Sequence, residues 1–406
     1  MENKFHGEFR RYGIRRRKSI IIALSVLSLI ILTSSGVYSK IKIWSITMLA
    51  CNALPRTDIE FTAAEQSLQG DSVMATKTHV EGYDGILDCI RTLKELIYGG
   101  RMFTNDDVIS ACQKFRHSKN LQSEFHDETV IPNIAHFLWF YEDQPLRFDQ
   151  FISILSAYAV MKADKIMIHT DMEPIGKYWE ILKETINTLE IVPLHLPQLC
   201  LFNNVHHRTD LARLQILLKY GGVYLDNDVI VVRSLEPLRH YDFVMGREIP
   251  LNPDFLNNGI IMASKNSQFL KLFYLGYKIY YGNCWSCDSM QYANALAIQF
   301  PDLIHVEERS FHQTDTLLTF EGHFPWWKEH YTVHTFARTY LNRARNKVEA
   351  LDKVNPDSSV WESALKKLDN SFGEIARYVY EASKATLTIN NITTSAKVKE
   401  RTQNMG

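Results

Sequence analysis

Three consecutive residues of this chain, Asp226-Asn227-Asp228, place two carboxylates two positions apart. At a kinked strand end both carboxylates can face the same way and offer the hard oxygen ligands that Mg²⁺ and Mn²⁺ prefer. The triplet alone is weak, because turns are rich in Asp and Asn. Its context is more informative: the apolar residues 223–225 come directly before it and predict a strand that ends at the carboxylates.

The segment before that strand predicts a helix with a second pair of charged groups. Residues 209–220 place leucines on one face, and Gly221-Gly222 ends the pattern. Asp210 and Arg213 are three positions apart and therefore share a face of this helix. They can form an exposed ion pair of little consequence. The alternative is that they face the same cleft as the Asp226 pair.

These elements belong to a longer alternation of strands and helices. Apolar runs at 131–140, 165–169 and 190–194 predict strands, and residues 148–162 and 175–188 between them predict helices. This order is typical of an α/β layer with a largely parallel sheet, whose ligands gather at the carboxyl ends of the strands. Further along, we expect strands at 229–232, 243–246 and 259–263, helices at 267–281 and 289–299, one long helix at 357–384 and a frayed polar end.

The stretch RTDLARLQILLKYGGVYLDNDV (208–229) resembles the core motif of family 32 glycosyltransferases, which have a DXD sugar-binding region and include α-1,4-galactosyl-, N-acetylglucosaminyl- and mannosyltransferases. It is also similar to the core of the glucosylating bacterial toxins. The resemblance extends to IPNIAHFLWF (131–140), NNGIIMASKNSQFL (257–270) and VHTFART (333–339). It implies a GT-A fold: a Rossmann-like α/β domain with a mixed, mostly parallel sheet that binds a nucleotide-sugar and Mn²⁺ or Mg²⁺.

The resemblance also implies roles for individual residues. Asp226 would contact the ribose and the metal, and Asp228 would ligate the metal directly. Asp210 and Arg213 match the pair that holds hydroxyls of the donor sugar. His334 falls where related enzymes place a histidine near the metal or the diphosphate; the alternative is a surface histidine.

Four more residues have implied roles around the donor. Trp139 matches the aromatic residue that stacks on the base, unless it packs in the core. Tyr224 lies beside the metal, and Asn257 or Asn258 touches the transferring sugar.

On the acceptor side the sequence departs from the family. CWSCDSMQYANAL (284–296) stands where members often carry a Gly-Pro pair, so the acceptor site is not readable, although Asp288 can occupy its rim. The implied reaction is retaining transfer of a sugar, from a UDP-sugar by preference, to a glycan, glycoprotein or glycolipid. An inactive relative that binds a glycan or a nucleotide-sugar is the alternative.

The N-terminus predicts a membrane anchor. Six basic residues between positions 10 and 18 precede residues 19–39, which carry no charge. About 20 apolar residues are needed to span a bilayer, and the basic flank predicts a cytosolic N-terminus. A cleaved signal peptide ending near residue 36 is the alternative. A short tail (1–18), one anchor and a lumenal remainder are typical of a type II Golgi enzyme.

Composition and cysteine content fit this plan. A net charge of -1 excludes a whole-chain basic field for nucleic acid, and 12% aromatic residues exclude global disorder. All six cysteines follow the anchor, where disulfides are allowed. Cys89 and Cys112, on helices expected at 83–98 and after Thr104, can join. Cys284 and Cys287 form a CxxC pair, but no thioredoxin-like βαβ unit surrounds it.

The sequence thus predicts five regions. They are a cytosolic tail (1–18), an anchor (19–39), a stem with a small helical part (40–128), a GT-A catalytic domain (129–345), and a C-terminal helix with a polar tail (346–406).

Overall fold

The computed structural model describes residues 77–99, 104–112, 131–140, 144–195, 205–248, 252–280, 284–311, 316–336 and 359–403. In these ranges, no helix is both long enough and apolar enough to cross a bilayer. The tail and anchor predicted at residues 1–39, and most of the predicted stem, lie outside the described residues.

A seven-stranded sheet has the order β3-β2-β1-β4-β7-β6-β8. The strands are β1 (Ile134–Trp139), β2 (Lys165–Thr170), β3 (Leu189–Pro193), β4 (Gly222–Leu225), β6 (Phe243–Glu248), β7 (Asn252–Ala263) and β8 (His305–Glu307). β3, β2, β1 and β4 run parallel, β7 is antiparallel to β4 and β6, and β8 is parallel to β6. The predicted mixed, mostly parallel α/β sheet is confirmed. The strand order reverses between β1 and β4, which is where such sheets bind ligands.

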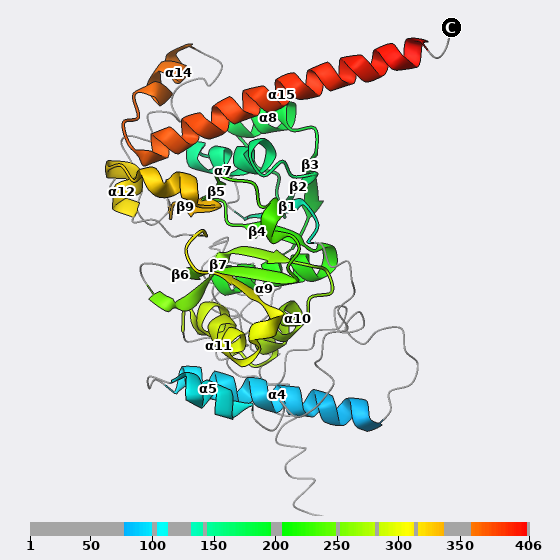
Figure 1. The fold of residues 1–406 in the computed structure, drawn as a ribbon, viewed down its shortest axis with the longest axis vertical. Helices are drawn as coiled ribbons and strands as arrows, with labels where there is room; N and C mark the ends of the chain where they lie inside the picture. Colours follow the sequence, from blue (N-terminus) through cyan, green and yellow to red (C-terminus); the bar gives the residue numbers. More distant parts are fainter. Residues whose placement is uncertain are drawn as a thin grey trace, which may run out of the picture. The chain divides into compact units, whose positions relative to one another are not determined.

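Helices cover both faces of this sheet. They are α7 (Phe148–Ala159), α8 (Lys177–Thr185), α9 (Val205–Tyr220), α10 (Gln268–Leu275) and α11 (Tyr292–Gln299). Figure 1 shows α7 and α8 on one face and α9, α10 and α11 on the other. Every residue of α7 is buried, because β5 (Val229–Val231) and the C-terminal helix both pack against it. The helix expected at 267–281 ends earlier, at Leu275, where a 3₁₀ turn follows.

A small second sheet brings a late part of the chain to the acidic triplet. β5 pairs antiparallel with β9 (Thr332–His334), and Val229 lies opposite His334. Because β5 begins directly after Asp228, this pairing places His334 next to the end of β4, although the two lie more than 100 positions apart in the sequence.

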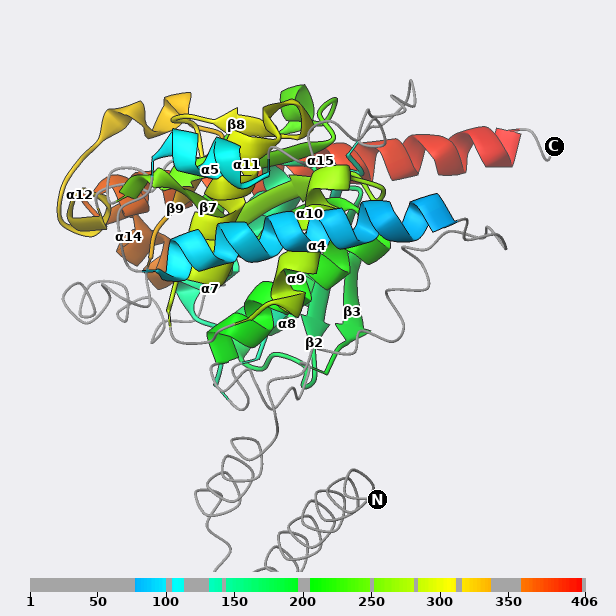
Figure 2. The same cartoon turned by 90° about the horizontal axis from the view of Figure 1, so that it is seen from below.

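Two helices precede the sheet in the chain and pack against α11, one of the helices that cover it. α4 (Lys77–Tyr98) and α5 (Asn105–Ala111) confirm the two predicted N-terminal helices, and Thr104 caps α5 as a capping box. The Cys89–Cys112 disulfide joins them, as predicted. Figures 1 and 2 show both helices beside α11, which they contact together with the π-helix Cys287–Gln291. They are therefore packed against the sheet domain.

The C-terminal prediction was wrong in two respects. The expected single helix at 357–384 is two, α14 (Ser359–Lys366) and α15 (Ser371–Gln403), and α15 continues through the end that was expected to fray. Asn370 causes the break, since its side chain accepts a hydrogen bond from the Gly373 amide and starts a new helix. No Pro or Gly follows Gly373 until the last residue, so nothing in the sequence stops α15.

A buried histidine pair joins β1 and β2. His136 lies 2.8 Å through Nε2 from the Gly221 carbonyl oxygen and 3.0 Å through Nδ1 from Nε2 of His169. His136 therefore donates to the carbonyl and accepts from His169, which requires the His136 ring to be neutral. Burial lowers the pKa of His136 to about 4 and that of His169 to about 3.

We expect this pair to make the fold sensitive to acid. Both histidines have a pKa of about 6.5 when unfolded, so acid favours the unfolded chain below that pH. The stability that depends on each neutral histidine is complete above about pH 6.5. It falls by about 1.4 kcal/mol per pH unit as the pH decreases from there toward the folded pKa. Urea unfolding at pH 7 and pH 5 measures the slope. His169→Gln should flatten it by about half, whereas His240→Gln, at an exposed histidine, should not. An unchanged slope in His169→Gln would contradict the assignment.

Candidate active site

The acidic triplet and His334 form one cluster at the carboxyl end of β4. One ligand atom each from Asp226, Asp228 and His334 lies within 4.8 Å of the others. Nε2 of His334 is 3.1 Å from Oδ1 of Asp228, and the amide and hydroxyl of Thr335 both donate to the Asp228 carbonyl oxygen, at 2.9 and 3.0 Å. The surface-histidine alternative is wrong, since His334 is buried. The structure thus brings together the three residues predicted to hold the metal.

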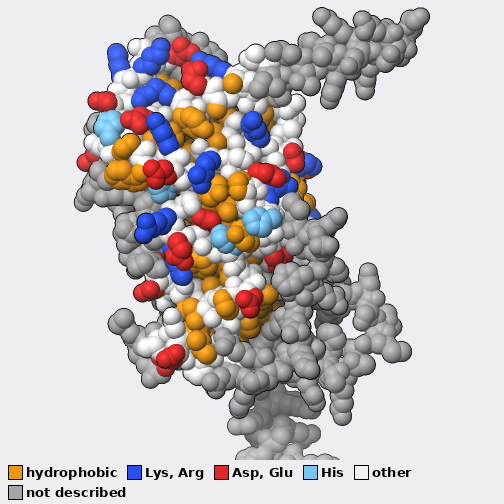
Figure 3. Space-filling view, in the orientation of Figure 1, with side chains coloured by type: hydrophobic (Ala, Val, Ile, Leu, Met, Phe, Trp, Pro, Cys, Tyr) orange, Lys and Arg blue, Asp and Glu red, His pale blue; other side chains and the backbone are white. Residues whose placement is uncertain are grey.

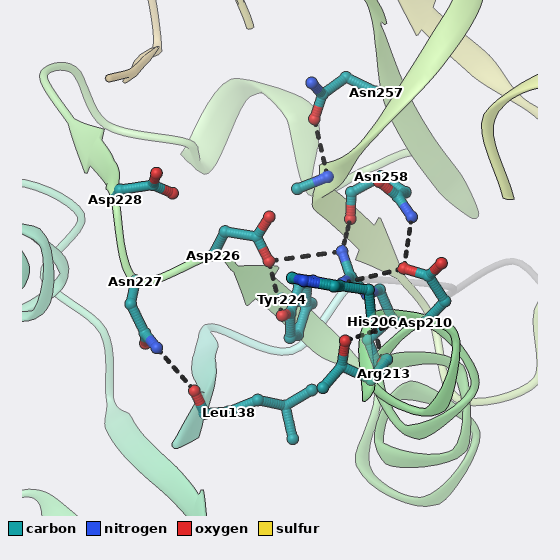
Figure 4. Close-up of polar contacts among 12 residues, drawn as sticks. Leu138, His206, Asp210, Arg213, Tyr224, Asp226, Asn227, Asp228, Asn257 and Asn258 are labelled. Atoms are coloured by element: carbon teal, nitrogen blue, oxygen red, sulfur yellow. Dashed lines mark hydrogen bonds and ion pairs between the residues drawn. The ribbon is translucent and has the colours of Figure 1, made fainter. Parts of the chain in front are cut away.

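Arg213 connects this cluster to the start of α9 (Figure 4). Its guanidinium lies 3.0 Å from Oδ1 of Asp210 and 3.4 Å from Oδ1 of Asp226, and it donates to the Asn258 carbonyl oxygen. It also packs 4.6 Å from the centre of the Tyr224 ring. Arg213 and Asp210 are both buried, so the alternative of an exposed ion pair is wrong.

Two further contacts complete the network around Asp210 and Asp226. The Asn258 side chain donates to Oδ1 of Asp210 at 2.8 Å, and the Tyr224 hydroxyl donates to Oδ1 of Asp226 at 2.7 Å. Oδ1 of Asp226 is thereby held by protein donors, while its other oxygen, Oδ2, lies close to Gly259. The donor-binding residues predicted on α9, β4 and β7 therefore converge.

Asn257 and Glu248 support His334 from the opposite side. The Asn257 side chain donates to Glu248 on β6, accepts from the Gly259 amide at 2.7 Å, and lies 3.5 Å from Nδ1 of His334. Gly259 allows these groups to approach, because a Cβ there would lie 2.7 Å from the His334 ring and 2.9 Å from Oδ2 of Asp226. Asn257 therefore positions the metal-side residues.

Sequence reasoning missed two residues of this site. Glu248 is buried beneath Asn257, and burial raises its pKa. Phe336 stacks on the His334 ring with the ring centres 3.8 Å apart, and its backbone has a φ of 47°. Such a φ is unusual for a bulky residue and marks a constrained position. Phe336 belongs to the VHTFART stretch, but nothing in that sequence predicts its positive φ.

Asn227 and Trp139 face away from the cluster. The Asn227 side chain donates to the Leu138 carbonyl oxygen at 2.7 Å and ties the triplet to the end of β1. Trp139 exposes only 1% of its surface and lies in the hydrophobic core. Its ring therefore offers no face to a nucleotide base, and this burial favours the core-packing alternative.

The Asp228 carboxylate and the His334 imidazole of the cluster shift each other's pKa values. Burial opposes ionisation of Asp228, but the His334 imidazole prevails and holds the pKa of Asp228 below its usual range. Burial likewise disfavours the charged imidazole, and Asp228 outweighs it and raises the pKa of His334. Burial raises the pKa of Asp210, against the opposing charge of Arg213. Asp228 and His334 thus favour each other's charged forms, and a bound cation can supply positive charge at the same place.

The donor set fits a divalent ion. Two carboxylates and one imidazole supply hard oxygen and nitrogen ligands, and one oxygen of each carboxylate is free of the contacts described above. Mg²⁺ is usually bound through carboxylates and phosphate oxygens. An imidazole ligand favours a transition ion such as Mn²⁺.

Asp288, which we expected on the acceptor side, is held by two side chains of α4. It is buried and accepts hydrogen bonds from Lys94 and Tyr98 of α4. Cys284 and Cys287 form a disulfide next to it. Asp288 is therefore a buried residue that is bonded to α4.

A family model described as "Glycosyltransferase sugar-binding region containing DXD motif" matches residues 146–244. This segment includes Asp210, Arg213, Tyr224 and the acidic triplet, whereas Asn257, Asn258 and His334 follow it.

Two curated proteins are similar over longer stretches. The chain is 24% identical over 277 residues to "Glucan organizing enzyme 1" of Cryptococcus neoformans var. grubii, a match that covers 61% of this chain and 70% of that protein. It is 30% identical over 145 residues to "Inositol phosphoceramide mannosyltransferase 3" of Schizosaccharomyces pombe, and this match covers 36% of each. The solved structure titled "PaToxG Glycosyltransferase" superposes with a TM-score of 0.32 at 16% identity, covering 73% of this chain and 97% of that one.

Proposed function

This chain is a glycosyltransferase with a DXD sugar-binding region, and we propose that it transfers a hexose from a nucleotide-sugar with retention of configuration and in dependence on a divalent ion. The donor is a UDP-sugar by preference, and the acceptor is a glycan, glycoprotein or glycolipid, as for family 32. The observation that carries the proposal is that two groups of residues are in direct contact. Arg213, which pairs with Asp210, also forms an ion pair with Asp226 of the cluster of Asp226, Asp228 and His334.

The two groups of residues can have different roles, one at the charged diphosphate and the other at the sugar. Cleavage of the bond between sugar and diphosphate leaves negative charge on the phosphate, which the divalent ion stabilises as a Lewis acid when bound. Asp226, Asp228 and His334 would hold that ion. Arg213 is fixed by Asp210, Asp226 and the Asn258 carbonyl before any donor arrives. Such preorganised groups need no rearrangement in the transition state and can orient the sugar hydroxyls.

The assembled site speaks against the inactive relative. Residues from α9, β4, β7 and β9 meet at one point with hydrogen-bonding geometry, and none of the predicted metal ligands is replaced. A binding protein without catalysis would not need the cluster of two carboxylates and an imidazole that the fold maintains.

A donor panel with controlled metal tests the proposal. We expect the purified full-length chain to release UDP from one UDP-sugar in the presence of Mn²⁺, with Mg²⁺ less effective. EDTA should abolish this release, and added Mn²⁺ should restore it. Product anomers resolved by NMR test retention. Full turnover in EDTA would contradict the metal-dependent mechanism, and failure of every UDP- and GDP-sugar would contradict transfer from a nucleotide-sugar.

Arg213→Lys should separate sugar binding from nucleotide binding. Lysine keeps the charge between Asp210 and Asp226 but loses the planar fork that contacts several acceptors. A contact worth about 1.5–3 kcal/mol corresponds to a loss of one to two decades in transfer rate. UDP affinity should change by less than about threefold, or 0.65 kcal/mol. Rate, UDP affinity and melting temperature measured on the same variant decide the question, and equal losses in rate and affinity would refute a role in gripping the sugar.

The proposed location is the Golgi membrane, in type II orientation with the described residues in the lumen. Its support is the uncharged segment at 19–39 behind six basic residues, together with the disulfides Cys89–Cys112 and Cys284–Cys287, which form in oxidising compartments. Protease added to sealed Golgi vesicles should leave the lumenal part intact. Digestion without detergent would contradict this orientation.

We expect no nucleic-acid partner, because the net charge of the chain is -1. Acidic and basic side chains are interspersed over the coloured part of the face in Figure 3, in keeping with the net charge of -1.

A further inference from the structure

One tryptophan near the site is exposed to an unusual degree. Trp285 exposes 61% of its surface, the largest fraction among the exposed large hydrophobic residues of the described ranges. Its ring lies 4.7 Å from that of His206, tilted by 61°, and 6.3 Å from that of His207. His207 in turn lies edge-on to Tyr280 at 5.5 Å. We call Trp285, His206, His207 and Tyr280 the indole platform.

The indole platform adjoins the donor site. His206 and His207 lie in the first turn of α9, and Asp210 follows one turn later on the same helix. Figure 4 shows His206 beside Asp210. A group bound on Trp285 would therefore lie on the same side of α9 as the donor sugar.

Two neighbouring features of the chain restrict the position of Trp285. The Cys284–Cys287 disulfide closes a loop that contains Trp285. The π-helix Cys287–Gln291 follows, and its Asp288 is fixed by Lys94 and Tyr98 of α4. π-helical turns often occur at functional sites. An exposed tryptophan on a rigid base can bind a ligand without first losing conformational freedom.

The platform also contains a polar atom without a partner. Nδ1 of His207 contacts the Tyr280 hydroxyl, but Nε2 is buried and has no hydrogen-bond partner among the described residues. His207 exposes only 5% of its surface. Unpaired buried polar groups are rare in folded proteins, and Nε2 of His207 can therefore bond to a group outside the described residues.

From these observations we propose that the indole platform is the acceptor subsite and binds a pyranose ring. One face of a pyranose is lined by C–H groups and stacks on an indole, while its hydroxyls can bond to imidazoles at the rim. Two imidazoles, those of His206 and His207, flank the Trp285 ring, and their polar atoms favour a sugar over a lipid tail. This inference rests on the proposed function, because it names the class of acceptor for the same site.

Saturation-transfer NMR on the full-length chain tests the subsite without a known acceptor. The probes are the methyl α-D-pyranosides of galactose, mannose and glucose. We expect at least one to receive saturation at its ring C–H protons, and Trp285→Ala to weaken its affinity by about tenfold. Trp285→Phe should retain part of the effect. Trp326→Ala is the matched control, because Trp326 is 47% exposed and lies on the 3₁₀ helix Pro325–Glu329.

The outcomes separate this inference from the proposed function. Equal binding by wild type and Trp285→Ala, or no binding of any pyranoside by wild type, would overturn it. Quenching of Trp285 by phosphatidylcholine vesicles without any pyranoside effect would also overturn it, in favour of a lipid surface. UDP release from a UDP-sugar in Mn²⁺, without acceptor, reports on the proposed function alone.

Discussion

Asp228→Asn should lower turnover by about 10²- to 10³-fold, the range for loss of one group that stabilises charge in a transition state. Asparagine has the same shape and can keep the contact with His334, so the change removes chiefly the negative charge. That charge faces His334 at 3.1 Å and completes the only cluster of metal-ligand type in the described ranges. A weaker hold on the ion leaves the developing phosphate charge less stabilised.

The matched control for this variant is Asp171→Asn. Asp171 follows the carboxyl end of β2 in the same sheet but is exposed and outside the cluster, so its loss should leave turnover unchanged. Melting temperatures should change little in both variants. Equal activity of Asp228→Asn and Asp171→Asn would contradict the role of Asp228, and a large fall in the stability of Asp228→Asn would mean that its role is structural.

Lys94→Met should destabilise the fold by about 3–5 kcal/mol, the cost of leaving one partner of a buried ion pair alone. Lys94 exposes none of its surface, and it donates to Asp288 while lying 4.3 Å from the centre of the Tyr292 ring. Burial lowers the pKa of Lys94, and the charge of Asp288 opposes this. Methionine fills much of the same volume but leaves the carboxylate without a counter-charge.

Guanidinium unfolding of two further variants makes this prediction specific. Lys183→Met removes a half-exposed lysine from surface ion pairs and should cost no more than about 1 kcal/mol. Lys94→Met/Asp288→Asn removes both charges, while Tyr98 can still donate to residue 288, and should recover most of the lost stability. A free energy of unfolding for Lys94→Met within error of wild type would show that α4 is not held by this pair.

The central part of the site could be predicted because its signals are local. A leucine-faced helix, Gly221-Gly222, an apolar strand and the acidic triplet follow one another within residues 209–228, and each step has a physical meaning in the sequence. The structure agrees at each step, with α9 ending at Tyr220, φ values of 66° and 104° at the two glycines, and β4 ending at Leu225. His334 was identified only through a resemblance.

What could not be predicted depends on contacts between distant residues. Glu248 reaches His334 only through Asn257, and Lys94 meets Asp288 across 194 positions. Neither residue stands in a recognisable pattern. The break between α14 and α15 depends on the Asn370 side chain, which also donates to the Phe320 carbonyl oxygen, 50 positions away. Helical periodicity continues across this break, so a pattern of apolar residues cannot locate it.

The most direct test of the account is an anomalous-scattering map at the manganese edge from crystals grown with Mn²⁺ and UDP. The account predicts one strong peak at coordination distance from Asp226, Asp228 and Nε2 of His334, with the diphosphate of UDP on its open side. The peak should be lost in Asp228→Asn at the same Mn²⁺ concentration. UDP bound elsewhere, or a peak that avoids these three residues, would contradict it.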